Sequence, residues 1–209
     1  MSKCVALLAL LAGLGSLPAA AEPPPLRDAD RALTGVPGQP NAPAAVLFNN
    51  AEFWMRDFSR QEASSRLRVQ VRVKILTDAG ISRGEIQIPH SRWVRLQNFS
   101  GRTTLPDGRV VPVSPDAKFI RKTSQRQKRF VTSVAFPAVA VGAILDYEYE
   151  LRFDSFYFLE PWLLSDVIPV RLAEIVYHVP KEIGVQTWSR DPFQVGVKTE
   201  KTTEVRSNL

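Results

Sequence analysis

The residues from Arg66 to Ile75 alternate strictly between polar and aliphatic side chains, in the order R-L-R-V-Q-V-R-V-K-I. Successive side chains of a β-strand point to opposite faces, so the aliphatic residues share one face and the cations and the glutamine share the other. A helix would scatter the same residues around its circumference. The segment therefore predicts a half-buried strand with a basic outer face.

A second segment, Ala143–Asp154, alternates in the same way but carries an acidic face. Its apolar residues are Leu145, Tyr147, Tyr149, Leu151 and Phe153, and its charged residues are Asp146, Glu148, Glu150, Arg152 and Asp154. Opposite charges on neighbouring strands contribute about 0.2–1 kcal/mol per pair. We therefore predict that the two strands are neighbours, directly or through one intervening strand.

Further short apolar runs are separated by frequent turn signals. Asp107-Gly108 is a strong hairpin signal, because glycine tolerates the positive φ of a tight turn. Many short strands without a long helical period predict an all-β fold, an antiparallel β-sandwich with a signal-peptide helix and at most one other short helix. Phe156–Ser165 is expected to be that helix or an aromatic loop. The other expected strands are Ala45–Phe58, Gly84–Pro89, Trp93–Leu105, Arg129–Phe136, Leu172–Val179, and a hairpin of Val185–Trp188 with Phe193–Val197.

The first 21 residues read as a secretory signal peptide. Lys3 supplies a positive start, Val5–Leu17 is a 13-residue apolar run, and small residues end the segment. Cleavage is expected between Ala21 and Glu22. The alternative is an uncleaved anchor, but the run is shorter than the ~20 residues that a membrane-spanning helix needs. The predicted location is periplasmic or secreted.

Residues 22–43 hold six prolines and few apolar side chains. Proline disfavours both helix and strand, so we interpret this stretch as a flexible linker, with a proline-rich docking motif as the alternative. The folded domain is then expected at residues 44–209. The predicted organisation is a signal peptide at 1–21, a linker at 22–43 and one β-sandwich domain.

Little in the sequence indicates catalysis. Cys4 is the only cysteine and lies in the signal peptide, so the mature chain is expected to lack disulfides, thiolate metal sites and a cysteine nucleophile. No G-x-S-x-G nucleophile motif is present. His178 and Glu174 would lie ~13 Å apart on one strand, too far to share a metal, and His90 stands at a strand end. We predict no catalytic residue, no metal site and no cofactor.

The carboxylates Asp146, Glu148 and Glu150 invite comparison with the paired acids of glycoside hydrolases. Their regular spacing along one strand face is better explained by a solvated face that meets arginines. We therefore assign them a structural role.

Four stretches in a fixed order carry a family resemblance. They are VKILTDAG at 73–80, TLPDGRVVP at 104–112, AFP at 135–137 followed by VGAILDYEY at 141–149, and VIPV at 167–170. Together they resemble a bacterial exported domain of unknown function that precedes a transglutaminase-like domain, over roughly Ala45–Pro180. The resemblance implies a β-sandwich accessory module, with a Cys-His-Asp triad in a separate downstream domain. The chain ends near where that domain would begin, so it is expected to be either a truncated form of a longer protein or a stand-alone relic.

The sharpest charge run is Lys118–Arg129, with the sequence KFIRKTSQRQKR and no acid. The structural interpretation is an exposed loop between strands, and the functional one is contact with an anionic envelope surface. Nucleic acid is not an expected partner, because only Phe119 could stack on a base and the chain is exported. Phe156–Leu164 is the best candidate for an exposed apolar patch. The predicted interaction surface comprises Arg121, Lys122, Arg126, Lys128, Arg129, Phe156, Tyr157 and Trp162.

The predicted function is that of a non-catalytic exported module with an interaction or scaffolding role. Its expected partner is a transglutaminase-like domain, in the same polypeptide or in another. The alternative is a module that binds carbohydrate or the envelope surface, which a formal net charge of +6 permits. A sugar-stacking platform would use Trp54, Trp93, Trp162, Trp188 and Tyr157, although core packing is the commoner fate of aromatic residues.

Overall fold

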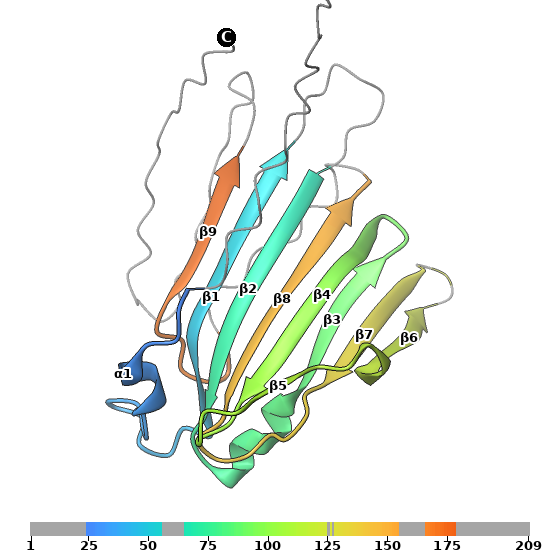
Figure 1. The fold of residues 1–209 in the computed structure, drawn as a ribbon. Helices are drawn as coiled ribbons and strands as arrows, with labels where there is room; N and C mark the ends of the chain where they lie inside the picture. Colours follow the sequence, from blue (N-terminus) through green and yellow to red (C-terminus); the bar gives the residue numbers. More distant parts are fainter. Residues whose placement is uncertain (1–23, 56–64, 125, 127, 155–165, 179–209) are drawn as a thin grey trace, which may run out of the picture.

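The computed structural model describes residues 24–55, 65–124, 126, 128–154 and 166–178 (Figure 1). They form two β-sheets, one of six strands in the order β5-β4-β8-β2-β1-β9 and one of three in the order β3-β7-β6. The predicted mainly-β sandwich is confirmed. The strands are β1 (Ala44–Met55), β2 (Ser65–Ile75), β3 (Glu85–Ser91), β4 (Val94–Thr104), β5 (Val110–Pro112), β6 (Lys118–Ser124), β7 (Arg129–Ala135), β8 (Ile144–Phe153) and β9 (Ala173–His178).

The two alternating segments become β2 and β8, and they pair directly and antiparallel at the centre of the larger sheet. The predicted neighbourhood of the two strands is therefore confirmed. Their inner faces carry Val69, Val71, Val73 and Leu145 into the main hydrophobic core. One strand departs from the antiparallel pattern, because β9 lies parallel to β1 at the edge of the sheet.

The smaller sheet supplies the opposite wall of this core. Ile86 packs against the buried clusters, and Ile88 of β3 and Val134 of β7 are almost inaccessible. Phe136, which follows β7, contacts the ring of Tyr147 edge-on, with 5.8 Å between the centroids. Apolar burial between two sheets is the main source of stability in such a fold.

The expected strands in the described part of the chain occur as β1, β3, β4, β7 and β9, with shifts of a few residues at their ends. The predicted hairpin turn joins β4 and β5. Gly108 has a φ of 88°, and its amide donates to the carbonyl of Leu105 at 2.9 Å. The expected hairpin at Val185–Val197 and the segment Phe156–Ser165 lie outside the described residues.

The prediction of a loop at Lys118–Arg129 is wrong for most of the segment. Its first part is the strand β6, which pairs antiparallel with β7, and of the described residues that follow, Arg126 and Lys128 lie in a turn. The polar/apolar alternation that revealed β2 is missing here, because β6 is exposed on both faces. Hydrogen bonding to β7 therefore forms the strand without the pattern of a buried face.

The N-terminal stretch also differs from the linker that we expected. Residues 24–43 include a short helix, α1 (Asp28–Arg31), and they pack on the larger sheet. The reason lies in β2, where Arg72 donates to the carbonyl of Pro24 at 2.7 Å and Lys74 donates to that of Arg31 at 2.9 Å. Prolines lack an amide hydrogen, but their carbonyls remain good acceptors.

The remaining helical elements are two 3-10 turns, η1 (Asp78–Gly84) and η2 (Pro115–Ala117). Among the described residues, no helix is long and apolar enough to span a membrane. The predicted signal peptide lies outside the described residues.

Candidate interaction surfaces

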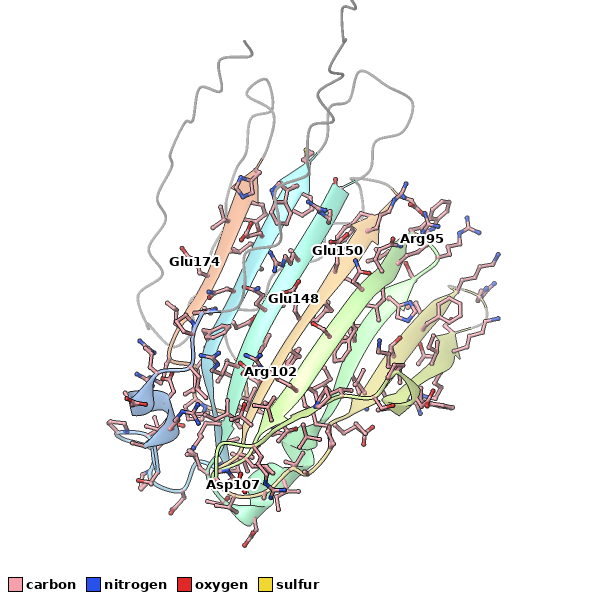
Figure 2. All side chains as sticks on the ribbon, in the orientation of Figure 1. Arg95, Arg102, Asp107, Glu148, Glu150 and Glu174 are labelled. Atoms are coloured by element: carbon pink, nitrogen blue, oxygen red, sulfur yellow. The ribbon has the colours of Figure 1, made fainter. Side chains whose placement is uncertain are left out.

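The outward side of the larger sheet is strongly charged. We call it the charged face, and Figure 2 shows Arg102, Glu148, Glu150 and Glu174 along it, from three different strands. Its cations on β2 stand opposite the carboxylates of β8, since Arg72 pairs with Asp146 and Arg68 with Glu150 in the strand register. The ion pairs connect both directly opposite and diagonal neighbours.

One end of the charged face is buried. Arg72 has a side-chain exposure of 1%, and its Nε donates to Oδ1 of Asp146 at 2.6 Å. The other oxygen, Oδ2 of Asp146, has no hydrogen bond, but it lies 3.5 Å from Nε of Arg102. The aromatic ring of Phe48 covers the guanidinium of Arg72 at 5.0 Å. This end of the face is therefore not the solvated surface that we expected.

The N-terminal segment covers that end with a second carboxylate, Asp30. Asp30 is almost fully buried, and its oxygens lie 3.1 Å from Arg27, 3.4 Å from Arg171 and 3.8 Å from Arg72. Three guanidinium groups from different parts of the chain thus converge on one carboxylate. Desolvated charges require such compensation, so the arrangement fixes the N-terminal segment on the sheet.

The other end of the charged face is half-exposed but still paired. Arg68 donates to both oxygens of Glu148 at 2.8 Å, and Gln70 donates to one of them at 2.9 Å. Burial works to raise the pKa of Glu148, but these hydrogen bonds outweigh it and hold the pKa below its ordinary value. Glu150 lies 3.7 Å from Arg66. The expectation that these carboxylates meet arginines is confirmed.

The two described tryptophans of the proposed sugar-stacking platform each have another side chain against the ring. Trp54 on β1 has the guanidinium of Arg66 at 4.7 Å and the stacked imidazole of His178 at 5.2 Å, and these residues come from the two flanking strands. Trp93 has the guanidinium of Arg92 over its ring at 4.0 Å. The other proposed platform residues, Tyr157, Trp162 and Trp188, lie outside the described residues.

The two histidines lie on different sheets. His90 bonds to the Thr132 hydroxyl at 2.9 Å, and burial lowers its pKa. His178 has Glu52 at 3.8 Å. In the described ranges, no group of three or more His, Cys, Asp or Glu residues could hold a metal ion.

A small pocket of about 180 Å³ lies beside the buried end of the charged face, with Arg31, Lys74 and Thr104 among its lining residues. Lys74 does not point a free amine into it, because its Nζ donates to the carbonyls of Gly142 and Arg31 at 2.7 and 2.9 Å. Burial, and then the charge of Arg31, lower the pKa of Lys74, with Asp30 partly opposing them. The lysine therefore has a structural role.

The second charged region is the hairpin of β6 and β7, which we call the basic hairpin (Lys118–Arg129). It brings together the five predicted cations, Arg121, Lys122, Arg126, Lys128 and Arg129, and all five are exposed. Within the described part of the chain, no carboxylate forms an ion pair with Arg121, Arg126, Lys128 or Arg129. The predicted residues Phe156, Tyr157 and Trp162 lie outside the described residues.

The outer strand of this hairpin also exposes apolar side chains. Phe119 is 66% exposed and Ile120 is 63% exposed, on opposite faces of β6. On the outer face of the small sheet, Phe119 and Arg121 line a groove of about 340 Å³, whose other side carries Glu85 and Gln87 of β3. The groove exists because the middle strand, β7, has only small side chains here, Ser133 and Ala135.

Sequence reasoning found the cations of the basic hairpin and missed the exposed strand. A usable signal was the adjacent pair Phe119-Ile120 inside a charged run. Neighbouring residues of a strand face opposite ways, so two adjacent apolar residues cannot both be buried in a two-layer edge strand.

Comparison with known proteins places these surfaces on a recognised domain. Residues 62–208 match the model of a family described as a domain of unknown function with a solved structure, DUF3857. The fold is similar to a Parabacteroides distasonis ATCC 8503 protein named "putative protease", with a TM-score of 0.58 and 16% identity. That match covers 66% of this chain and 29% of the other, so the chain spans less than a third of that protein's length.

A weaker likeness is to native leukotriene A4 hydrolase from Saccharomyces cerevisiae. The TM-score is 0.36 at 14% identity, over 58% of this chain and 17% of the enzyme. No curated protein matches the sequence.

Proposed function

Because this chain belongs to the DUF3857 family, we propose that it is a non-catalytic, exported interaction module that supports a transglutaminase-like domain, in the same polypeptide or in another. The ordered motifs of the sequence support this partner. The solved relative is consistent with a module of this kind, since the shared fold accounts for 29% of that longer chain.

The observation that carries the proposal is the exposure of β6. Six of its seven residues are exposed, including two large apolar ones, Phe119 and Ile120. Phe119 and Ile120 lie on opposite faces of β6, so this strand offers an apolar contact surface on both sides of the sheet. An edge strand adds backbone hydrogen-bonding groups to that surface.

The carboxylate arrangement supports a role without chemistry. Asp146, Glu148 and Glu150 each lie within 3.7 Å of an arginine side chain. A general acid needs a raised pKa, and Glu148 has a lowered one. These groups stabilise the sheet, so the proposed activity is binding.

The second candidate function is contact with an anionic envelope component, either a phospholipid headgroup or an acidic glycan. The exposed cations of the basic hairpin favour this function. Within the described residues, no carboxylate forms an ion pair with Arg121, Arg126, Lys128 or Arg129. Such binding would fall steeply with added salt.

Titration calorimetry of the purified chain with a purified transglutaminase-like domain tests the main proposal. We expect a complex that the double variant Phe119→Asp, Ile120→Asp abolishes and that Val167→Asp leaves intact. Val167 is a suitable control because it is exposed to 90% and belongs to the segment before β9, where Val170 bridges to Val46 of the larger sheet. Absence of a complex, or substrate turnover by the chain that one substitution abolishes, would contradict the proposal.

Export has its own test. The chain expressed with its N-terminus intact in a Gram-negative host should appear in the periplasm, and Edman sequencing should begin at Glu22. Retention in the cytoplasm with Met1 still present would contradict it.

A further inference from the structure

The outer strand of the small sheet, β6, has one edge that pairs with no other described strand. The order β3-β7-β6 places β6 at the end, with β7 on one side and, within the described residues, no strand on the other. Edge strands can pair with another extended chain, and many proteins prevent this with charged side chains or bulges. In β6 the register irregularity lies beyond Lys122, so Lys118–Arg121 keeps regular strand geometry.

The side chains of β6 alternate between two different environments. Phe119 and Arg121 lie on the outer groove. Lys118 lies on the opposite side, where its Nζ donates to the carbonyl of Phe99 at 3.4 Å and sits 5.2 Å from that residue's ring. Ile120 shares the side of Lys118, because positions two apart in a strand face the same way.

We propose that the outer edge of β6 binds an extended acidic peptide segment as a fourth strand of the small sheet. The inference rests on the proposed interaction function and specifies the chemistry of its partner. Backbone hydrogen bonds along Lys118–Arg121 supply affinity, and the alternating side chains supply selectivity. The basic hairpin contains no acid, and Arg121 forms no ion pair with a carboxylate of the described residues, so acidic side chains in the peptide would complement its charge.

Two other occupants fit the observations less well. A second copy of the chain would place β6 against β6 and set arginines and lysines against each other, which is unfavourable. A flat membrane surface would meet cations on one side only, whereas the β6 side chains point to both faces of the sheet.

The geometry fixes a sequence pattern for the peptide. Side chains opposite Lys118, Phe119, Ile120, Arg121 and Lys122 should be acidic, apolar, apolar, acidic and acidic. Antiparallel pairing is the more stable arrangement per residue. Antiparallel pairing reverses the order, so the probe is acetyl-Thr-Glu-Asp-Val-Ile-Glu-Thr-amide, with its first Glu opposite Lys122 and its last Glu opposite Lys118. A scrambled peptide of the same composition is the control.

Backbone methylation of the probe tests strand addition directly. In an antiparallel pair, the amides of alternate residues point to the same neighbour. We expect N-methylation of alternate residues in one register to weaken binding to the purified full chain by about tenfold or more, and methylation in the other register to leave binding almost unchanged. Equal losses in both registers would overturn the proposal.

Charge reversal at matched positions separates the β6 edge from general attraction. Arg121→Glu should weaken the probe by about tenfold, whereas Arg129→Glu, on β7, should weaken it less than about threefold. Circular dichroism confirms that both variants are folded. Equal losses in the two variants, or tighter binding to phosphatidylglycerol vesicles than to the probe with the same variant dependence, would overturn the proposal in favour of nonspecific or lipid contact.

These outcomes are independent of the test of the proposed function. A chain that binds a transglutaminase-like domain but not the peptide uses another surface, and strand addition is then wrong. A chain that binds the peptide in the expected register but no such domain keeps strand addition and loses the proposed partner.

Discussion

The charged face and the basic hairpin both carry rows of arginine and lysine, but their surroundings differ completely. On the charged face, Arg68 and Arg72 each bond to a carboxylate, and the pair of Arg72 with Asp146 is buried. On the basic hairpin, Arg121 and Arg129 are exposed and have no carboxylate partner among the described residues. The first region uses charge to hold the sheet together, and the second leaves its charge exposed. Counting cations in the sequence does not distinguish the two roles, whereas burial and pairing do.

The buried end of the charged face should show the largest effect on stability. Arg72→Met leaves Asp146 and Asp30 without their shared guanidinium, and we expect the free energy of unfolding to fall by about 3–5 kcal/mol. Urea denaturation measures the loss. Arg95→Met is the matched control, because its pair with Asp154 is half-exposed and should contribute at most about 1 kcal/mol. Equal losses in the two variants would erase the distinction between buried and surface pairs.

The docking of the N-terminal segment should show the next largest effect. Asp30→Asn removes the charge that three arginines surround, and we expect a loss of about 1–3 kcal/mol together with faster proteolysis of residues 24–36. Asp28→Asn, an exposed position in the same helix, is the control and should change neither quantity. Unchanged proteolysis of the Asp30 variant would mean that apolar contacts alone hold the segment.

The half-exposed end should give the chain an acid sensitivity. The folded-state pKa of Glu148 is lowered, so its contribution is fully present above its ordinary pKa of 4.5 and is lost as the pH falls through the folded value. We expect wild type and Glu148→Gln to differ in melting temperature at neutral pH and to converge at about pH 3. Glu174→Gln, an exposed carboxylate on β9 of the same face, should follow wild type throughout. A difference between wild type and Glu148→Gln that persists in acid would contradict this assignment.

The basic hairpin should show the smallest effect on stability. Arg121→Glu is expected to change the free energy of unfolding by less than about 0.5 kcal/mol, because the side chain is exposed and has no ionic partner in the described structure. Thermal unfolding of the variant checks this. A loss above 2 kcal/mol, a cost of burying unpaired charge, would place Arg121 in a structural network like that of Arg72.

The central strands could be predicted from the sequence, because a strict period of two has one physical meaning. The segments Arg66–Ile75 and Ala143–Asp154 became β2 and β8, and their opposite charges predicted their pairing. The burial of Arg72 could not be predicted, because it depends on carbonyls of Pro24 and Pro25, which leave no pattern in the sequence. Strand β6 could not be predicted for a related reason: an edge strand that is exposed on both faces shows no alternation of polar and apolar residues.

The buried ion pair between β2 and β8 also bears on the register that the two strands adopt. The inner faces would accept a shift of two residues, because Val69, Val71 and Val73 would still meet apolar partners. The buried pair of Arg72 with Asp146 would not. A shift in one direction sets Arg72 opposite Ile144, and a shift in the other sets it opposite the longer side chain of Glu148. Elsewhere on the outer faces cations would still meet carboxylates, since Arg66 would lie opposite Glu150 or Asp154. The single buried ion pair, rather than the row of exposed ones, therefore favours the observed alignment among several that hydrophobic burial alone would leave nearly equivalent.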